Sequence, residues 1–223
     1  MDDSKKSINV EKARLKKSNF VLKEIMLKIL VVGDYGVGKT AVIRRYVEGK
    51  FTSNYKVTIG ADFSIKTMPW DSTTEVNIQL WDIAGNEKLT FMSRVYYKYA
   101  AAAVIVIDIS RIATFHSLQN WLKDIRDKVI LSDGLPVPII ILVNKCDINE
   151  ISVPLDALNK LSKQYGVLKW FKTSAKCNIN IDDAMKFIIT NAMKHKLKEY
   201  QQENENVILH SKIDNDKHNT CCD

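Results

Sequence analysis

One short glycine-rich segment carries residues whose types and spacing suit phosphate chemistry. Residues 33–40, GDYGVGKT, match the pattern G-x-x-x-x-G-K-[ST] without gaps. The glycines allow backbone N–H groups to turn inward around phosphate oxygens, and a helix that follows adds the positive end of its dipole. In this pattern the lysine, Lys39, reaches the β- and γ-phosphates, and the hydroxyl of Thr40 binds Mg²⁺. The segment predicts a nucleotide phosphate site with Mg²⁺.

A second segment, NKCD at residues 144–147, has the chemistry to recognise guanine. The Asp147 carboxylate can accept from both N1–H and the exocyclic amino group, a pair that adenine lacks, and a site built for such bonds rejects other ligands. We expect the stem of Lys145 to lie along the purine face. TSAK, residues 173–176, is expected to bring the Ala175 N–H to guanine O6. These segments argue against an adenine-dependent kinase or ATPase.

The stretch VNIQLWDIAGNEK, residues 76–88, alternates like a strand and then becomes a polar loop. We expect Asp82, at the end of the strand, to hold Mg²⁺ through water, as the second acid of phosphate-loop enzymes does. Gly85 can offer its N–H to a γ-phosphate, and Thr58 can bind Mg²⁺ from a mobile loop. Both contacts vanish with the γ-phosphate, so the pattern predicts a switch in which one phosphate orders two loops.

Apolar strands and amphipathic helices alternate around these motifs. The patterns predict strands at 25–32, 61–68, 74–81, 101–109, 138–144 and 168–174. They predict helices at 40–49, 113–131, 155–165 and 181–200, the second with Phe115, Leu118, Trp121, Leu122 and Ile125 at helical spacing. This order predicts an α/β domain with a six-stranded, mostly parallel sheet and helices on both faces. Ligands of such sheets bind beyond the carboxyl ends of the strands, where the polar motifs fall.

The bulk composition suits one domain with polar ends. The chain has 223 residues, 46% of them hydrophobic, which suits a domain of about 150–200 residues plus tails. We place a basic flexible extension at 1–24, the domain at 25–200 and a flexible hypervariable tail at 201–223. Residues 1–28 carry eight Lys/Arg against four Asp/Glu. This head either lies on an anionic membrane or nucleic acid or is a solvated tail.

Several classes of protein are not expected from the sequence. No apolar run approaches the ~20 residues of a membrane-spanning helix, and we see no secretory signal after the N-terminal MDDSKKS. The four cysteines form neither a disulfide framework nor a zinc spacing, which indicates a reducing, cytosolic chain. Neither end has the aromatic interleaving or the dense arginine of a nucleic-acid arm, so we expect no nucleic-acid partner.

In this order and spacing the motifs resemble the Ras superfamily of small GTPases, over about residues 27–192. IGADF (59–63), QLWDIAG (79–85), YYKYA (96–100) and VIVIDIS (104–110) resemble the segments that set Rab proteins apart. WDIAG, SRVYYK and DISR resemble the Rab branch associated with lysosome-related organelles. The resemblance implies a monomeric phosphate-loop (P-loop) GTPase that binds GTP or GDP with Mg²⁺ and, when GTP-bound, recruits effectors in vesicle trafficking.

The resemblance also implies roles for individual residues. It makes Asn86 and Lys39 catalytic, and places Mg²⁺ on Thr40, Thr58 and Asp82. The nucleotide-binding residues would be Gly33, Asp34, Tyr35, Gly36, Val37, Gly38, Lys39, Thr40, Ala41, Phe51 (edge-on to the base), Thr58, Gly85, Asn144, Lys145, Asp147, Ser174, Ala175 and Lys176. The effector-binding residues would be Ile59, Phe63, Trp81 and Tyr96. The three aromatic residues match a triad that Rab effectors read, and plain core packing is the alternative.

The implied partners are an exchange factor, a GTPase-activating protein, Rab escort protein, GDP-dissociation inhibitor and effectors. The implied location is the cytoplasmic face of endosomal, lysosome-related or Golgi-derived membranes, in exchange with the cytosol. Cys221 and Cys222 match the paired cysteines that carry geranylgeranyl groups in Rabs, although the ending CCD is unusual, and Thr220 excludes a C-a-a-X box. Two lipid chains anchor a protein stably to a membrane, whereas one lipid chain binds only marginally. The acidic tail adds no polybasic attraction, so we expect both geranylgeranyl groups to be needed. Two incidental thiols are the alternative.

Two residues depart from the family pattern. Asn86 stands where the family almost always has Gln, which orients the attacking water, and its side chain is one methylene shorter. A misplacement of ~1 Å can cost about 10²-fold, so we predict slow intrinsic hydrolysis unless a shifted loop lets Asn86 reach. Tyr35 replaces a small residue, and its ring could obstruct an incoming arginine finger. The alternative to a cycling switch is therefore a GTP-locked effector scaffold.

Overall fold

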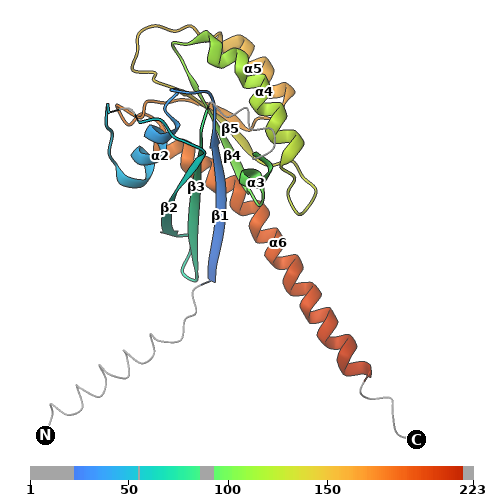
Figure 1. Ribbon diagram of the computed structural model, residues 1–223. Coiled ribbons are helices and arrows are strands. Elements are labelled where there is room, and N and C mark those ends of the chain that lie inside the picture. Colours follow the sequence, from blue (N-terminus) through green and yellow to red (C-terminus); the bar gives the residue numbers. More distant parts are fainter. Residues whose placement is uncertain (1–22, 55, 86–92, 218–223) are drawn as a thin grey trace, which may run out of the picture.

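Six strands form one sheet in the order β2-β3-β1-β4-β5-β6 in the computed structural model, which describes residues 23–54, 56–85 and 93–217 (Figure 1). The strands are β1 (Lys23–Val32), β2 (Ala61–Pro69), β3 (Thr74–Ile83), β4 (Ala102–Asp108), β5 (Ile139–Asn144) and β6 (Lys169–Lys172). All neighbouring pairs are parallel except β2 and β3, which form an antiparallel pair at one edge. The predicted six-stranded, mostly parallel sheet is confirmed.

Helices cover both faces of this sheet. The helices are α2 (Lys39–Glu48), α3 (Ser93–Tyr97), α4 (Ile112–Lys128), α5 (Leu155–Gln164) and α6 (Ile181–Lys217). Helices α2 and α6 pack on one face, while α3, α4 and α5 pack on the other. The α/β architecture with two helical layers is the predicted one.

The central strands are buried on both faces because their side chains alternate between the two helical layers. In β4, Val104 and Val106 join the cluster under α2 and α6, whereas Ile105 and Ile107 join the cluster under α4 and α5. Every residue of β4 and β5 is buried. A strand in this position has no solvent-facing side, which explains why its sequence is a continuous apolar run rather than an alternating one.

The structure corrects several predicted boundaries. Helix α6 continues to Lys217, so the predicted end near Tyr200 is wrong. Residues 201–217 contain no glycine or proline that would break the helix. Helix α4 ends at Lys128 and not at the predicted 131, because Ile130 pairs with Pro136 in an isolated β-bridge.

Strand β1 begins at Lys23, so the last two residues of the extension predicted at 1–24 belong to the sheet. The rest of that extension, residues 1–22, lies outside the described residues. Helix α3 had no counterpart in the sequence prediction.

We expect truncation of a doubly buried side chain in β4 to destabilise the protein strongly. Ile105→Ala should lower the free energy of unfolding by about 2–5 kcal/mol, because it removes a fully buried side chain and leaves a cavity. Urea denaturation at a fixed excess of Mg²⁺ and GDP measures the change, since bound ligand shifts stability. The control is Ile65→Ala on the edge strand β2, where the side chain is 51% exposed. Equal losses in the two variants would contradict the layered core.

Candidate functional site

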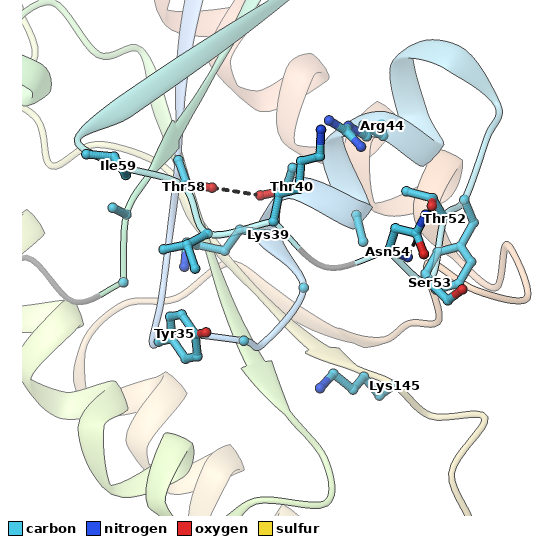
Figure 2. A pocket seen from close by; sticks show the side chains of 18 residues that line it. Tyr35, Lys39, Thr40, Arg44, Thr52, Ser53, Asn54, Thr58, Ile59 and Lys145 are labelled. Carbon is cyan, nitrogen blue, oxygen red and sulfur yellow. Dashed lines mark hydrogen bonds between the residues drawn. The ribbon is translucent and has the colours of Figure 1, made fainter.

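A cavity of about 470 Å³ lies beyond the carboxyl ends of the strands, as predicted (Figure 2). The phosphate loop between β1 and α2 forms one wall, the segment before β2 another, and Lys145 a third. Ten of the predicted site residues line it: Tyr35, Gly36, Gly38, Lys39, Thr40, Ala41, Phe51, Thr58, Gly85 and Lys145. Ile59, predicted as an effector contact, also lies at its rim and is 88% exposed.

Lys39 is a buried cation at the start of α2. Its Nζ donates to the carbonyl oxygens of Gly33 (2.9 Å) and Asp34 (3.0 Å), which curls the phosphate loop around the ammonium group. Burial lowers the pKa of Lys39 to about 8, while the nearby carboxylates of Asp82 and Asp34 oppose that shift. A buried ammonium with few counter-charges favours an anionic ligand, because the anion would stabilise the charged form. The residue is therefore poised to bind phosphate.

Three oxygen-bearing side chains converge beside Lys39. Thr40 Oγ1 lies 2.5 Å from Asp82 Oδ2 and 3.1 Å from Thr58 Oγ1, and Thr58 Oγ1 lies 3.3 Å from the same carboxylate oxygen. Burial raises the pKa of Asp82, against the hydrogen bonds from the threonines. Asp82 Oδ1 is buried and has no hydrogen-bond partner among the described residues. Hydroxyl and carboxylate oxygens are the ligands that Mg²⁺ prefers, so the residues present fit that ion.

A buried amide, that of Asn144, joins the predicted base-recognition loops to the phosphate loop. Asn144 Nδ2 donates to the carbonyl of Val37 (2.9 Å), and its Oδ1 accepts from the N–H of Ala175 (3.2 Å). Asp147 Oδ1 accepts from Ser174 Oγ at 2.6 Å. The Ala175 N–H predicted to reach guanine O6 thus has a protein partner here, and the O6 contact stays a prediction. Asn144 acts as a clamp between three loops.

The close approach of these loops requires residues without a side chain. A Cβ built at Gly38 would lie 2.5 Å from Asn144 Nδ2, and one at Gly85 would lie 2.3 Å from the backbone nitrogen of Tyr35. Both distances are far shorter than real Cβ contacts, so any larger residue would push the loops apart. Gly85 therefore closes β3 directly onto the phosphate loop, next to the ring of Tyr35 that lines the cavity.

The predicted effector triad brings together one aromatic residue from each of β2, β3 and α3. The rings of Phe63 and Trp81 stack with centroids 5.7 Å apart, and Trp81 lies 6.4 Å from Tyr96. Phe63 is 56% exposed, while Trp81 and Tyr96 are partly buried. The three aromatics are thus neither a closed core nor isolated, and their role in effector binding stays a prediction.

Some predicted site residues lie elsewhere. The cavity lining does not include nine of the predicted nucleotide or metal residues: Gly33, Asp34, Val37, Asp82, Asn144, Asp147, Ser174, Ala175 and Lys176. Asn86, Cys221 and Cys222 lie outside the described residues.

Sequence reasoning missed three residues that hold the loops in place. Arg45 on α2 donates from Nε to Ala175 O (2.8 Å) and from Nη2 to Lys176 O (3.0 Å). Trp121 on α4 donates to Asp34 Oδ1 at 2.8 Å, and Arg111 donates to the carbonyl of Tyr35 at 2.8 Å. By its spacing Trp121 belongs to the apolar face of its helix, and periodicity does not predict a hydrogen bond from its N–H. Nothing in the DISR segment predicts the contact that Arg111 makes with the phosphate loop.

Comparison with known proteins identifies the architecture. The family model described as "Ras family" matches residues 28–194. This chain belongs to the Ras family. It is 47% identical to human Ras-related protein Rab-32 over 168 residues, 75% of each chain, and 46% identical to the mouse protein over 175 residues, 78% of each. It is 42% identical to human Ras-related protein Rab-7L1 over 170 residues, 76% of this chain and 84% of the relative.

These similarities place the chain among Rab small GTPases, in the branch that includes Rab-32. It is accordingly a GTPase, which hydrolyses GTP to GDP and phosphate, and a GTP-binding switch in membrane trafficking. Among the described residues, no helix combines the length and apolar content that crossing a membrane requires.

We expect Asn144→Ala to loosen the nucleotide site. The change leaves the buried Val37 carbonyl and Ala175 N–H without their partner, which should cost about 1–3 kcal/mol of unfolding free energy. Release of a fluorescent GDP analogue should accelerate in parallel, because the phosphate and base loops lose their shared clamp. Asn149→Ala, an exposed asparagine on the following turn, is the matched control. Unchanged release with a normal unfolding curve would contradict the clamp.

Proposed function

We propose that this Rab GTPase is a Mg²⁺-dependent switch with slow intrinsic hydrolysis, anchored through lipids on Cys221 and Cys222. The observation that carries the Mg²⁺ assignment is the convergence of Thr40, Thr58 and Asp82 beside Lys39. Bound there, Mg²⁺ would neutralise charge on the β- and γ-phosphates. Thr58 comes from the loop before β2, so its contact is the one that a change of nucleotide would release.

The proposed residue roles follow from the site. Lys39 holds phosphate charge, the phosphate-loop amides surround it, and the loops at 144–147 and 174–176 read guanine. Phe51, at the cavity wall, flanks the base, and Gly85 offers its N–H to the γ-phosphate. Asn86 positions the attacking water, but its side chain is one methylene shorter than that of Gln. The shorter reach supports a slow rate of GTP hydrolysis. Tyr35, whose ring lines the cavity, stands where an arginine from an activating protein would enter.

The proposed setting is that of a trafficking Rab. Effectors bind the exposed face formed by Ile59, Phe63, Trp81 and Tyr96 when GTP is bound. An exchange factor, a GTPase-activating protein, Rab escort protein and GDP-dissociation inhibitor control the cycle. We place the protein on the cytoplasmic face of endosomal, lysosome-related or Golgi-derived vesicles. The alternative, favoured by Asn86 with Tyr35, is a scaffold that stays GTP-bound.

The nucleotide that the purified protein carries separates these two functions. The protein is purified in Mg²⁺ buffer and denatured, and the released nucleotide is identified by ion-exchange chromatography. Mostly GDP supports the cycling switch, and mostly GTP supports the scaffold. A protein that is empty and takes up no added guanine nucleotide would overturn both.

The matched variant for the hydrolysis rate is Asn86→Gln. It should raise the single-turnover rate of GTP hydrolysis by about 10–100-fold, because the longer amide restores the reach toward water. Asn149→Gln, which makes the same chemical change on an exposed turn, should leave the rate unchanged. Equal rates for wild type and Asn86→Gln would remove the proposed cause of slow hydrolysis.

Anchoring is tested on protein expressed in eukaryotic cells. Cys221→Ser and Cys222→Ser should each shift most of the protein from the pelleted membranes to the supernatant, because one chain binds only marginally. The control is Cys177→Ser, which replaces an exposed cysteine within the domain and should leave the protein on the membranes. Retention of both single variants on membranes would show that two lipids are not needed, and retention of the variant that carries both substitutions would mean that the cysteines are incidental.

A further inference from the structure

Arg111 lies immediately before α4 and bridges two loops of the site. Its Nη2 donates to the carbonyl of Tyr35 in the phosphate loop at 2.8 Å, and its Nε donates to Asp108 Oδ2 at 3.0 Å. A guanidinium can make both bonds at once because its donors are held in one rigid plane. Arg111 is not among the residues that line the nucleotide cavity, and both of its contacts are with other residues of the protein.

Asp108, at the end of β4, is the centre of this arrangement. It is 1% exposed, and the same Oδ2 lies 2.6 Å from Lys145 Nζ in the NKCD segment. Oδ1 accepts from the N–H (3.0 Å) and the hydroxyl (2.7 Å) of Ser110. Although burial opposes ionisation, hydrogen bonds from Lys145 and Ser110 hold the pKa of Asp108 below its usual value. One buried carboxylate thus joins a cation from each side of the nucleotide site.

A hydrogen bond from helix α4 itself fixes Asp34, the residue before Tyr35 in the phosphate loop. Trp121 Nε1 donates to Asp34 Oδ1 at 2.8 Å, one residue before the carbonyl that Arg111 holds. Asp34 and Tyr35 are also the loop residues that Gly85 packs against most closely. The phosphate loop is therefore held at two of its four variable positions, Asp34 and Tyr35, between the end of β3 and α4 with the residue before it.

We propose that Arg111 is a positioning residue for nucleotide retention, which couples the phosphate loop to the base-reading loop through Asp108 and Lys145. This inference rests on the proposed base-reading role of residues 144–147. A nucleotide held at both ends can leave only when one of the two loops moves away. Because the Arg111–Asp108–Lys145 chain ties the two loops together, displacement of either loop strains the other, and release is slow.

The test is the rate at which a fluorescent GDP analogue leaves the full-length protein in Mg²⁺ buffer with excess unlabelled GDP. Arg111→Ala should release it at least 10-fold faster than wild type. Arg111→Lys should fall in between, because an ammonium can pair with Asp108 but cannot fork to the Tyr35 carbonyl. Lys123→Ala, which removes an exposed cation from the same helix, should release at the wild-type rate.

Two further readouts separate positioning from simple loss of stability. Millimolar guanidinium should slow release from Arg111→Ala by refilling the vacated site, whereas a generally weakened fold would gain nothing from it. Asp108→Asn and Arg111→Ala should be non-additive, with the double variant close to the faster single one, because both break the same chain of contacts. Independent, multiplying effects would overturn the coupling.

The outcomes also distinguish this inference from the proposed function. Wild-type release rates in both Arg111 variants, with nucleotide still bound tightly, would overturn the role of Arg111 and leave the switch intact. A wild-type protein that retains no guanine nucleotide would overturn the proposed function itself. Faster release without guanidinium rescue, accompanied by a matching loss of unfolding stability in both variants, would reduce Arg111 to a structural residue.

Discussion

Burial of the central strands on both faces is the constraint on which the rest of this structure depends. Strands β4 and β5 contribute only buried residues, and each of them ends in a polar side chain, Asp108 or Asn144. A polar group within these strands would have no partner, since both neighbouring layers are apolar, and burial of an unpaired polar group is costly. Polar chemistry is therefore confined to the strand ends. The parallel direction of the strands then gathers those ends at one edge of the sheet, where the phosphate loop, Asp108, Asn144 and Thr173 meet.

The same constraint determines how the site is held together. Lys39, Asp82, Asp108 and Asn144 at this edge are buried, so their polar atoms need partners within the protein before any ligand arrives. Asn144 bonds to Val37 and Ala175, Lys39 to two loop carbonyls, and Asp108 to two cations. Asp82 Oδ1 is the exception among the described site residues, and it belongs to the carboxylate that we propose as a Mg²⁺ ligand. The hydrogen bonds that pair these polar groups in the absence of ligand also hold the loops in place, which pre-organises them for nucleotide binding.

The sequence was a good guide to the strands and a partial guide to the site. The motifs carry their own chemistry, and the apolar runs fix the sheet, so Lys39, Thr40, Asp82 and Asn144 could be placed at one edge. The roles of Arg111 and Trp121 could not be predicted. Each donates a hydrogen bond to the phosphate loop, which is far away in the sequence, whereas spacing indicates only which face of an element a residue occupies. The overrun of α6 has a different cause. Beyond Tyr200 the apolar pattern that predicts a helix fades. The helix nevertheless continues to Lys217, because residues 201–217 contain no glycine or proline to break it.

Tyr35 and Asn86 are the two departures from the family pattern, and the surroundings of Tyr35 bear on the effect of both. Its ring lines the cavity where the proposed activating arginine would approach, while its carbonyl is already held by an arginine of the chain itself. The backbone of this residue is therefore fixed from α4 and packed against Gly85, so the ring cannot be moved aside by a shift of the loop and must turn about its own side-chain torsions. A loop held this firmly favours retention of whichever nucleotide is bound, whereas the proposed cause of slow hydrolysis is the reach of Asn86. In these two proposals retention and turnover depend on different residues, so a long-lived GTP state would need no loss of Lys39 or of the proposed magnesium ligands.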